Sequence, residues 1–198
     1  TTVVFSPLVS LMNDQLWAMQ HRYGISAITL NSTALQQDPR RFWNSVNAVR
    51  QGHFKIVLIA PERLDDSRVV EAILARPVSL VVLDEAHCLS LWGHDFRPHY
   101  RRILPFVKST GDTTFLALTA TAPPRVSADL LRRMPGPASL FRISPMRENL
   151  ELHVIPCDGD IDKLSCLARI VPRLEGAGIV YCGTREESEN VAEFLNAR

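Results

Sequence analysis

Short apolar runs alternate along this chain with longer amphipathic segments, and this alternation limits the folds open to it more than any other feature. The runs are rich in β-branched residues, as buried strands are, and the longer segments carry apolar residues at helical spacing. Such an alternation is typical of βα units on a parallel sheet, so we predict an α/β fold. The expected strands are residues 2–5, 27–30, 55–60, 80–84, 114–118, 140–143, 151–155 and 178–182.

Prolines and capping residues mark where several of the helices are expected to begin. Pro7, Pro39 and Pro124 each fit the first turn of a helix, where a missing N–H costs nothing. Ser6 and Asp38 directly precede two of these prolines, and both residue types cap helix N-termini through a side-chain oxygen. The sequence therefore predicts a helix start at each of the three prolines.

The charge of the chain changes partway along it. The formal net charge is only +1, but residues 1–147 hold 17 Lys and Arg against 11 Asp and Glu, whereas residues 148–198 hold 5 against 10. The basic excess in the first part permits an anionic partner there without requiring one. A stretch rich in Pro and Gly, residues 134–150, coincides with the change. We therefore expect one α/β lobe at residues 1–148 and the beginning of a second, incomplete lobe at residues 149–198.

Neither a membrane span nor a cysteine framework is indicated. No run approaches the roughly 18 consecutive apolar residues of a span, and the first residues, TTVVFSP, lack the layout of a signal peptide. The four cysteines never form a CxxC pair, so the spacing suggests no zinc site and no disulfide framework. We expect a cytoplasmic protein without a membrane partner.

The segment SLVVLDEAHC, residues 79–88, ends an apolar strand on two carboxylates. Asp84 therefore lies at the carboxyl edge of the expected sheet, where ligands bind in open α/β folds. In nucleotide hydrolysis a carboxylate at this place holds Mg²⁺, and a neighbour such as Glu85 orients the attacking water. Taken alone, an Asp-Glu pair at a strand end is more often a solvated turn, so the surrounding residues decide between the two interpretations.

The segment that follows, LSLWGHDFRP, mixes aromatic and basic residues. Trp92 and Phe96 offer faces on which bases stack, a contact worth roughly 1–3 kcal/mol per base, and Arg97 offers a guanidinium for a phosphate or a ring. Aromatic residues at this density more often belong to a core. Core aromatics are seldom interleaved with Gly, His, Asp and Arg, so we interpret the segment as a loop that contacts single-stranded nucleic acid.

These two features occur together in a known family. From Asp84 onward the sequence resembles the DEAH-type helicases of superfamily two, and HCLSLWGHDFRPHY resembles the RecQ family of DNA helicases. Further segments resemble family motifs in family order: SPLVSLMNDQ (motif Ia), LNST (Ib), IAPERL (the segment before the DEAH strand), ALTATAPP (III) and GIVYCGTREESENVAEFL (IV). The resemblance thus extends over nearly the whole chain.

The resemblance implies a fold and an activity. Two RecA-like lobes of P-loop NTPase type, each a parallel sheet flanked by helices, bind ATP and Mg²⁺ between them and move 3′ to 5′ along single-stranded DNA. Residues 1–148 correspond to most of the first lobe and residues 149–198 to the beginning of the second. The implied partners are ATP and single-stranded or forked DNA, in repair and recombination. The implied location is the nucleoid in a bacterium or the nucleus in a eukaryote.

The resemblance also implies roles for single residues. Asp84 holds Mg²⁺, Glu85 activates water, and His87 links the nucleotide site to motif III through Thr119 or Thr121. A lone His is more often simply packed at a helix start, which is the plainer interpretation of His87.

A second set of residues is implied to contact DNA. Trp92 and Phe96 stack on bases or sense them, and Arg97 connects their loop to ATP hydrolysis. His94 shapes the loop or contacts groups near the nucleotide. The remaining members, which bond DNA phosphates at strand ends, are Ser6, Asn31 and Ser32. Ser6 equally fits a helix cap.

The chain contains no GxxxxGK[ST] phosphate loop, since none of its three lysines follows a glycine. Without that loop the phosphates of ATP lose their main binding groups. In the family it lies just before motif Ia, where this chain begins, and the arginine finger lies beyond motif IV. We therefore expect a piece of a longer helicase that by itself hydrolyses ATP negligibly.

Two other functions remain open at this point. One is a single-stranded nucleic-acid-binding module that does not hydrolyse ATP. The other is a DEAH-type RNA helicase, which is disfavoured because the WGHDFRP loop and the TAT segment that follows it belong to the DNA family.

Overall fold

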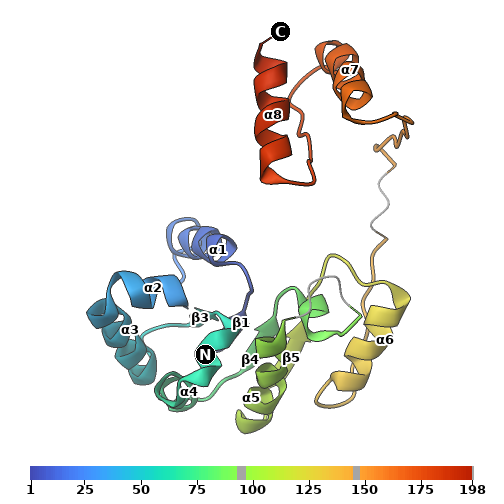
Figure 1. Cartoon of the computed structure of the whole chain (residues 1–198). Helices are drawn as coiled ribbons and strands as arrows, with labels where there is room; N and C mark the ends of the chain where they lie inside the picture. The colour runs from blue at the N-terminus through green and yellow to red at the C-terminus, as the bar shows by residue number, and fades with distance from the viewer. Residues whose placement is uncertain (93–96, 145–147, 198) are drawn as a thin grey trace. The chain divides into compact units, whose positions relative to one another are not determined.

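A parallel sheet of five strands forms the centre of the first of two compact units, Thr1–Pro145 (Figure 1). The computed structural model describes residues 1–92, 97–144 and 148–197, and the sheet is counted over these. The strand order is β2-β3-β1-β4-β5. The strands are β1 (Thr2–Phe5), β2 (Ala27–Leu30), β3 (Ile56–Ile59), β4 (Leu80–Leu83) and β5 (Thr114–Ala117).

All five strands run in the same direction and end at the same level. Phe5 pairs with Ile59 on one side and with Leu83 on the other, and Leu83 in turn pairs with Ala117. The residues that follow these strands therefore meet along one edge of the sheet. The predicted α/β class, a parallel sheet flanked by helices, is confirmed, and so are its first five strands, with ends shifted by at most one residue.

Helices and short 3₁₀ segments connect the strands. None of the helices in the described part of the chain is long and apolar enough to cross a membrane. The helices of this unit are α1 (Val9–His21), α2 (Ser32–Gln37), α3 (Pro39–Gln51), α4 (Ser67–Leu74), α5 (Ile103–Ser109) and α6 (Pro124–Arg133). The 3₁₀ segments are η1 (Pro61–Asp65), η2 (Ala86–Leu89) and η3 (Pro98–Arg102).

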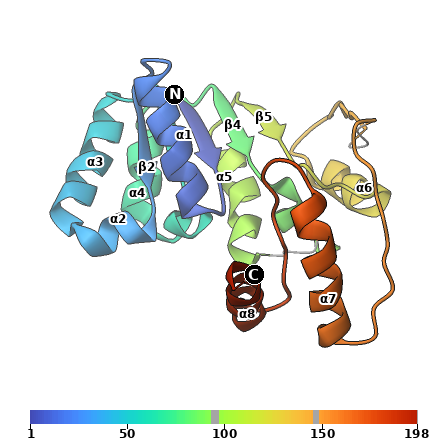
Figure 2. The same cartoon turned by 90° about the horizontal axis from the view of Figure 1, so that it is seen from above.

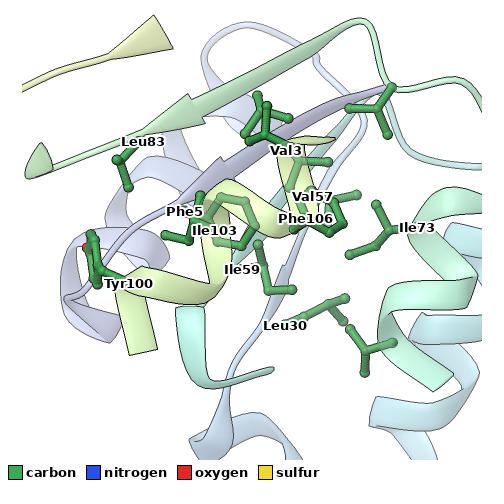
Figure 3. Packing of buried hydrophobic residues seen from close by; sticks show 14 of the residues in the cluster. Val3, Phe5, Leu30, Val57, Ile59, Ile73, Leu83, Tyr100, Ile103 and Phe106 are labelled. Carbon is green, nitrogen blue, oxygen red and sulfur yellow. The ribbon is translucent and has the colours of Figure 1, made fainter. Parts of the chain in front are cut away.

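The sheet is covered on both faces (Figures 1 and 2). On one face Met12 of α1 packs with Leu58 in the smaller apolar cluster. On the other face α3, α4 and α5 bury the larger cluster, in which the rings of Phe5 and Phe106 meet edge to face (Figure 3). Successive residues of a strand point to opposite faces, which is why Leu58 and Ile59 belong to different clusters.

Two of the three predicted helix starts are confirmed. Asp38 caps α3 by accepting a hydrogen bond from the backbone N–H of Arg41, and Pro39 begins the helix; α6 likewise begins at Pro124. The start expected at Pro7 was wrong, because α1 begins at Val9 with no side-chain cap. The hydroxyl of the expected capping residue, Ser6, lies between strand ends instead and donates to Asp84.

In the second compact unit, Met146–Arg198, the described residues form the helices α7 (Asp160–Ile170) and α8 (Arg185–Asn196) and the 3₁₀ segment η4 (Val171–Arg173). Thr184 and Glu187 form a capping box at the start of α8. α8 therefore begins where the side chains satisfy its first N–H groups.

The three strands expected at residues 140–143, 151–155 and 178–182 are not formed among the described residues. Their side chains are open to solvent, with Phe141 92%, Val154 93% and Tyr181 89% exposed. A parallel strand forms only where a neighbour satisfies its backbone groups and covers its faces. No described segment pairs with these three, so the β-branched residues alone do not make them strands.

The cap of α3 yields a stability prediction. Replacing Asp38 with Ala removes the acceptor for the Arg41 N–H. We expect the free energy of unfolding to fall by about 1 kcal/mol, because a donor of the first turn loses its partner. Urea denaturation followed by circular dichroism measures the change. Asp38→Asn keeps a capping oxygen and controls for the lost charge; equal loss in both variants would contradict the assignment.

Candidate functional site

Polar residues follow four of the five strands at the carboxyl edge of the sheet. Ser6 follows β1, Asn31 follows β2, and Asp84 follows β4, while Thr119 comes two residues after β5. Because β1 and β4 are neighbours, the Ser6 hydroxyl reaches a carboxylate oxygen of Asp84 at 3.4 Å. The sheet thus gathers side chains that are far apart in the sequence.

Asp84 is held on several sides. Its backbone N–H donates to the carbonyl of Phe5 at 2.9 Å, which extends the β1–β4 pairing by one residue. Its other carboxylate oxygen accepts from the N–H of Glu85 at 3.0 Å. The hydroxyl of the buried Tyr100 donates to its carbonyl at 3.3 Å. Burial raises the pKa of Tyr100 far above its usual value, so the hydroxyl keeps its proton.

Glu85 adopts a left-handed backbone conformation, with φ 47° and ψ 50°. Among the described residues it is the only one other than glycine with positive φ. Such a conformation costs about 1–2 kcal/mol and is found often at functional sites. Here it turns the chain so that the N–H of Ala86 donates to the carbonyl of Leu118 at 2.8 Å, which joins η2 to the end of β5.

His87 lies between the acidic turn, formed by Asp84 and Glu85, and the segment after β5. It is 6% exposed, and its Nδ1 lies 3.1 Å from Glu85 Oε2 and 3.0 Å from Thr119 Oγ1. The Thr119 hydroxyl donates its own hydrogen to the carbonyl of Thr121 and accepts from the Thr121 N–H. It can therefore only accept from His87, so the network assigns the proton to His87 Nδ1.

These contacts bring together five of the predicted site residues. Asp84, Glu85, His87, Thr119 and Thr121 form one continuous hydrogen-bonded group, with Thr119 as the direct partner of His87. The group runs from the acidic pair to the segment that leads into α6.

Asn31 and Ser32 lie further along the same edge, beside β3. The Asn31 side chain is buried and caps α2 by accepting from the N–H of Ala34 at 2.8 Å. The Ser32 hydroxyl donates to Glu62 of η1 at 2.8 Å. Both side chains therefore have partners within the protein.

The aromatic loop, residues 89–98 (LSLWGHDFRP), is described only at its two ends. His94 and Phe96 lie outside the described residues. At the far end Arg97 donates its backbone N–H to the carbonyl of Cys88 and its guanidinium to the carbonyl of Pro7, both near 3 Å. Arg97 thus connects the loop to the segment after β1.

At the near end Trp92 is 53% exposed and lies against α6. Its backbone N–H donates to the Ser90 hydroxyl, which donates in turn to Asp129 at 2.8 Å. The guanidinium of Arg125 stands over the indole, 3.2 Å from the ring centroid. Two residues of α6 therefore fix the position of Trp92.

Asp129 is ionised although it is buried. Burial raises the pKa of its carboxyl group, but hydrogen bonds from Arg133 and Ser90 more than compensate, so the pKa lies below its usual value. Sequence reasoning missed both Arg125 and Asp129. Asp129 shares a helix face with the buried Val126 and Leu130, and an acid on such a face indicates a buried partner.

The acidic pair fits a magnesium ion of the kind that accompanies nucleotides. Among the described residues no three His, Cys, Asp or Glu side chains form a metal cluster. Mg²⁺ in nucleotide sites needs only one or two carboxylates, because water and phosphate supply the remaining ligands. The Asp84 carboxylate at the sheet edge has the chemistry for that part.

A sequence profile described as "DEAD/DEAH box helicase" matches residues 1–130. The chain belongs to this family. It is similar to the ATP-dependent DNA helicase RecQ of Bacillus subtilis (36% identity, covering 98% of this chain and 32% of the relative). It is also similar to the probable ATP-dependent DNA helicase RecS of that organism (34% identity, covering 99% and 39%).

The expected resemblance to RecQ-type helicases is therefore confirmed, and the chain spans about a third of the length of these curated relatives. Among solved structures, the helicase domain of Hef from Pyrococcus furiosus aligns at 18% identity with a TM-score of 0.47. That alignment covers 67% of this chain and 26% of the other.

The lowered pKa of Asp129 predicts a pH dependence. A carboxyl group whose pKa is depressed by folding stabilises the fold above its unfolded-state pKa, about 4, and this stabilisation is lost as the pH falls through the folded-state value. We expect Asp129→Asn to flatten the loss of stability below pH 4. Urea midpoints between pH 2.5 and 6 measure it. Parallel curves for the two proteins would mean that Asp129 contributes nothing to the acid transition.

Proposed function

We propose that this chain forms part of an ATP-dependent DNA helicase of RecQ type, which couples hydrolysis of ATP with Mg²⁺ to 3′–5′ movement on single-stranded DNA and to unwinding of forked duplexes. The family membership supports the helicase class. The proposed coupling of ATP hydrolysis to movement on DNA rests on the hydrogen-bonded group that connects the acidic pair, through His87, with Thr119.

The acidic pair divides the work of hydrolysis between two carboxylates. Asp84 is oriented by the N–H of Glu85 and by Ser6, and its carboxylate would hold the magnesium ion. When bound, that ion supplies positive charge to the phosphates. The His87 Nδ1–H holds the Glu85 carboxylate in place. From this position Glu85 orients the attacking water and accepts its proton.

His87 transmits a change at either end of the group. Its ring is buried, so a displacement of Glu85 moves the hydrogen bond to Thr119. Thr119 and Thr121 lie on the segment that leads into α6, and α6 carries the partners of Trp92. This series of contacts gives the aromatic loop a physical route to the nucleotide. Arg97, which contacts the segment after β1, offers a second route.

Trp92 is the described residue of the loop best placed to contact DNA, because more than half of its surface is open. His94 and Phe96 remain predicted members of the same surface. Ser6, Asn31 and Ser32 remain predicted phosphate contacts; each side chain bonds within the protein, so binding through it requires an exchange of partners.

The second unit is proposed to begin the second RecA-like lobe, at residues 149–198. Its motif IV segment includes α8 and the Thr184 capping box. We propose a DNA-associated location, the nucleoid or the nucleus.

The decisive experiment uses the gene product that carries this sequence, at its full natural length. We expect Glu85→Gln to lower ATP turnover by about 10²-fold or more, because the base that orients water is lost, while ATP binding persists. Glu71→Gln, at an exposed glutamate of α4, is the matched control and should turn over ATP normally. Coupled-enzyme ATPase assays measure both, and near-normal turnover by Glu85→Gln would refute the assigned role.

The same assay separates the alternatives. Stimulation by single-stranded DNA and not by RNA of equal length supports the DNA helicase. Stimulation by RNA alone supports the RNA helicase. Nucleic-acid binding without turnover supports a binding module.

A further inference from the structure

We propose that Arg125 is a positioning residue for the aromatic loop: its guanidinium covers one face of Trp92, holds the ring against α6, and leaves the remaining surface to receive a base. The part that concerns DNA rests on the proposed function. The part that concerns the position of Trp92 does not, because it follows from contacts within this chain.

The ring contact is close and specific in its geometry. The central carbon of the Arg125 guanidinium lies 3.2 Å from the centroid of the Trp92 ring, so the planar cation lies over one face of the indole. Trp is the aromatic side chain that attracts a cation most strongly, and Arg is its most frequent partner. Even so, 53% of Trp92 remains exposed, so the cation occupies only part of the surface that a base requires.

The backbone of Trp92 is held to the same helix. The Trp92 N–H bonds to the Ser90 hydroxyl, and that hydroxyl donates to Asp129, four residues after Arg125 on α6. Residues four apart on a helix lie on one face. Ring and backbone are thus attached to adjacent positions of one rigid element, which defines the orientation of the indole.

The charges around this contact favour a ring partner for Arg125. Asp129 is already paired with Arg133 and Arg132, so it is not the counter-ion that Arg125 needs. A guanidinium placed over a π face keeps its edge open to water, as the exposure of Arg125 permits.

The placement also links the loop to motif III. Arg125 is four residues after Thr121, at the start of α6, and Thr121 bonds to the partner of His87. A shift of Trp92 therefore changes the contacts through which Thr119 and His87 hold the acidic turn. Arg125 has this role without touching nucleotide or reacting atoms.

Tryptophan fluorescence of the 198-residue chain tests the position of Trp92 directly. The background carries Trp17→Phe, because Trp17 is exposed and emits independently. Subtracting the signal of a Trp17→Phe/Trp92→Phe protein removes the contribution of Trp43. Acrylamide quenching then reports how open the Trp92 ring is.

We expect Arg125→Ala to raise the quenching constant of Trp92 by about twofold, because a covered face becomes open. Arg125→Lys should restore part of the protection, since an ammonium is also attracted to the ring. Arg40→Ala, at an exposed arginine of α3, removes the same charge elsewhere and should leave quenching unchanged. Equal quenching with and without Arg125 would overturn the proposal.

Anisotropy of a fluorescein-labelled dT oligonucleotide tests the DNA part on the same proteins. Arg125→Ala should weaken binding by about two- to fivefold with an unchanged dependence on salt, because the lost contact is to the ring and not to a phosphate. A salt slope smaller by about 0.7 would mean that Arg125 binds a phosphate, and would overturn the positioning role. If the unmodified chain binds no oligonucleotide, the proposed DNA contact fails, while the quenching result still decides the place of Arg125.

Discussion

The backbone of Leu118 holds the rest of the site together. Its N–H donates to the carbonyl of Leu83 and its carbonyl accepts from the N–H of Ala86, both at 2.8 Å. One residue thus ties the end of β4, the acidic turn after it and the end of β5 into one unit. Thr119 comes next in the chain, so the same two bonds bring it to His87. Leu83 and Ala86 are buried, and buried residues rarely leave backbone groups unpaired, which makes this alignment costly to change.

The segment that follows β4, residues 84–98, contains two regions that depend on this alignment. The acidic pair lies at the sheet edge, where Ser6 and the Glu85 N–H hold the Asp84 carboxylate and His87 holds the Glu85 carboxylate. The start of the aromatic loop turns to α6, which holds Trp92 through a ring contact and a serine-aspartate bond. Both regions meet the segment between β5 and α6. The proposed helicase function needs such a meeting point, because binding of DNA and hydrolysis of ATP must influence one another.

Much of the first unit could be predicted from the sequence, because its three inner strands, β1, β3 and β4, combine buried apolar runs with neighbours on both sides. The cap at Asp38 and the position of Asp84 were predictable for the same reason, since local chemistry and tertiary packing agree. Ser6 shows where they disagree: its oxygen fits a helix cap, but the register of β1 and β4 places it beside a carboxylate. The strands expected at residues 140–143, 151–155 and 178–182 depend on partners that a local pattern does not reveal. Arg125 was missed because a surface arginine becomes informative only when the ring beneath it is known.

The central claim is that His87 and Thr119 act as one link between the nucleotide and the aromatic loop. A double-mutant cycle with His87→Ala and Thr119→Val, in the full-length gene product, tests it most directly through the ratio of ATPase rates with and without single-stranded DNA. Residues that act through one shared bond are not additive, so the double variant should lose no more DNA stimulation than the more severe single variant. Losses that multiply across the two substitutions would show that the residues act independently, and would contradict the account.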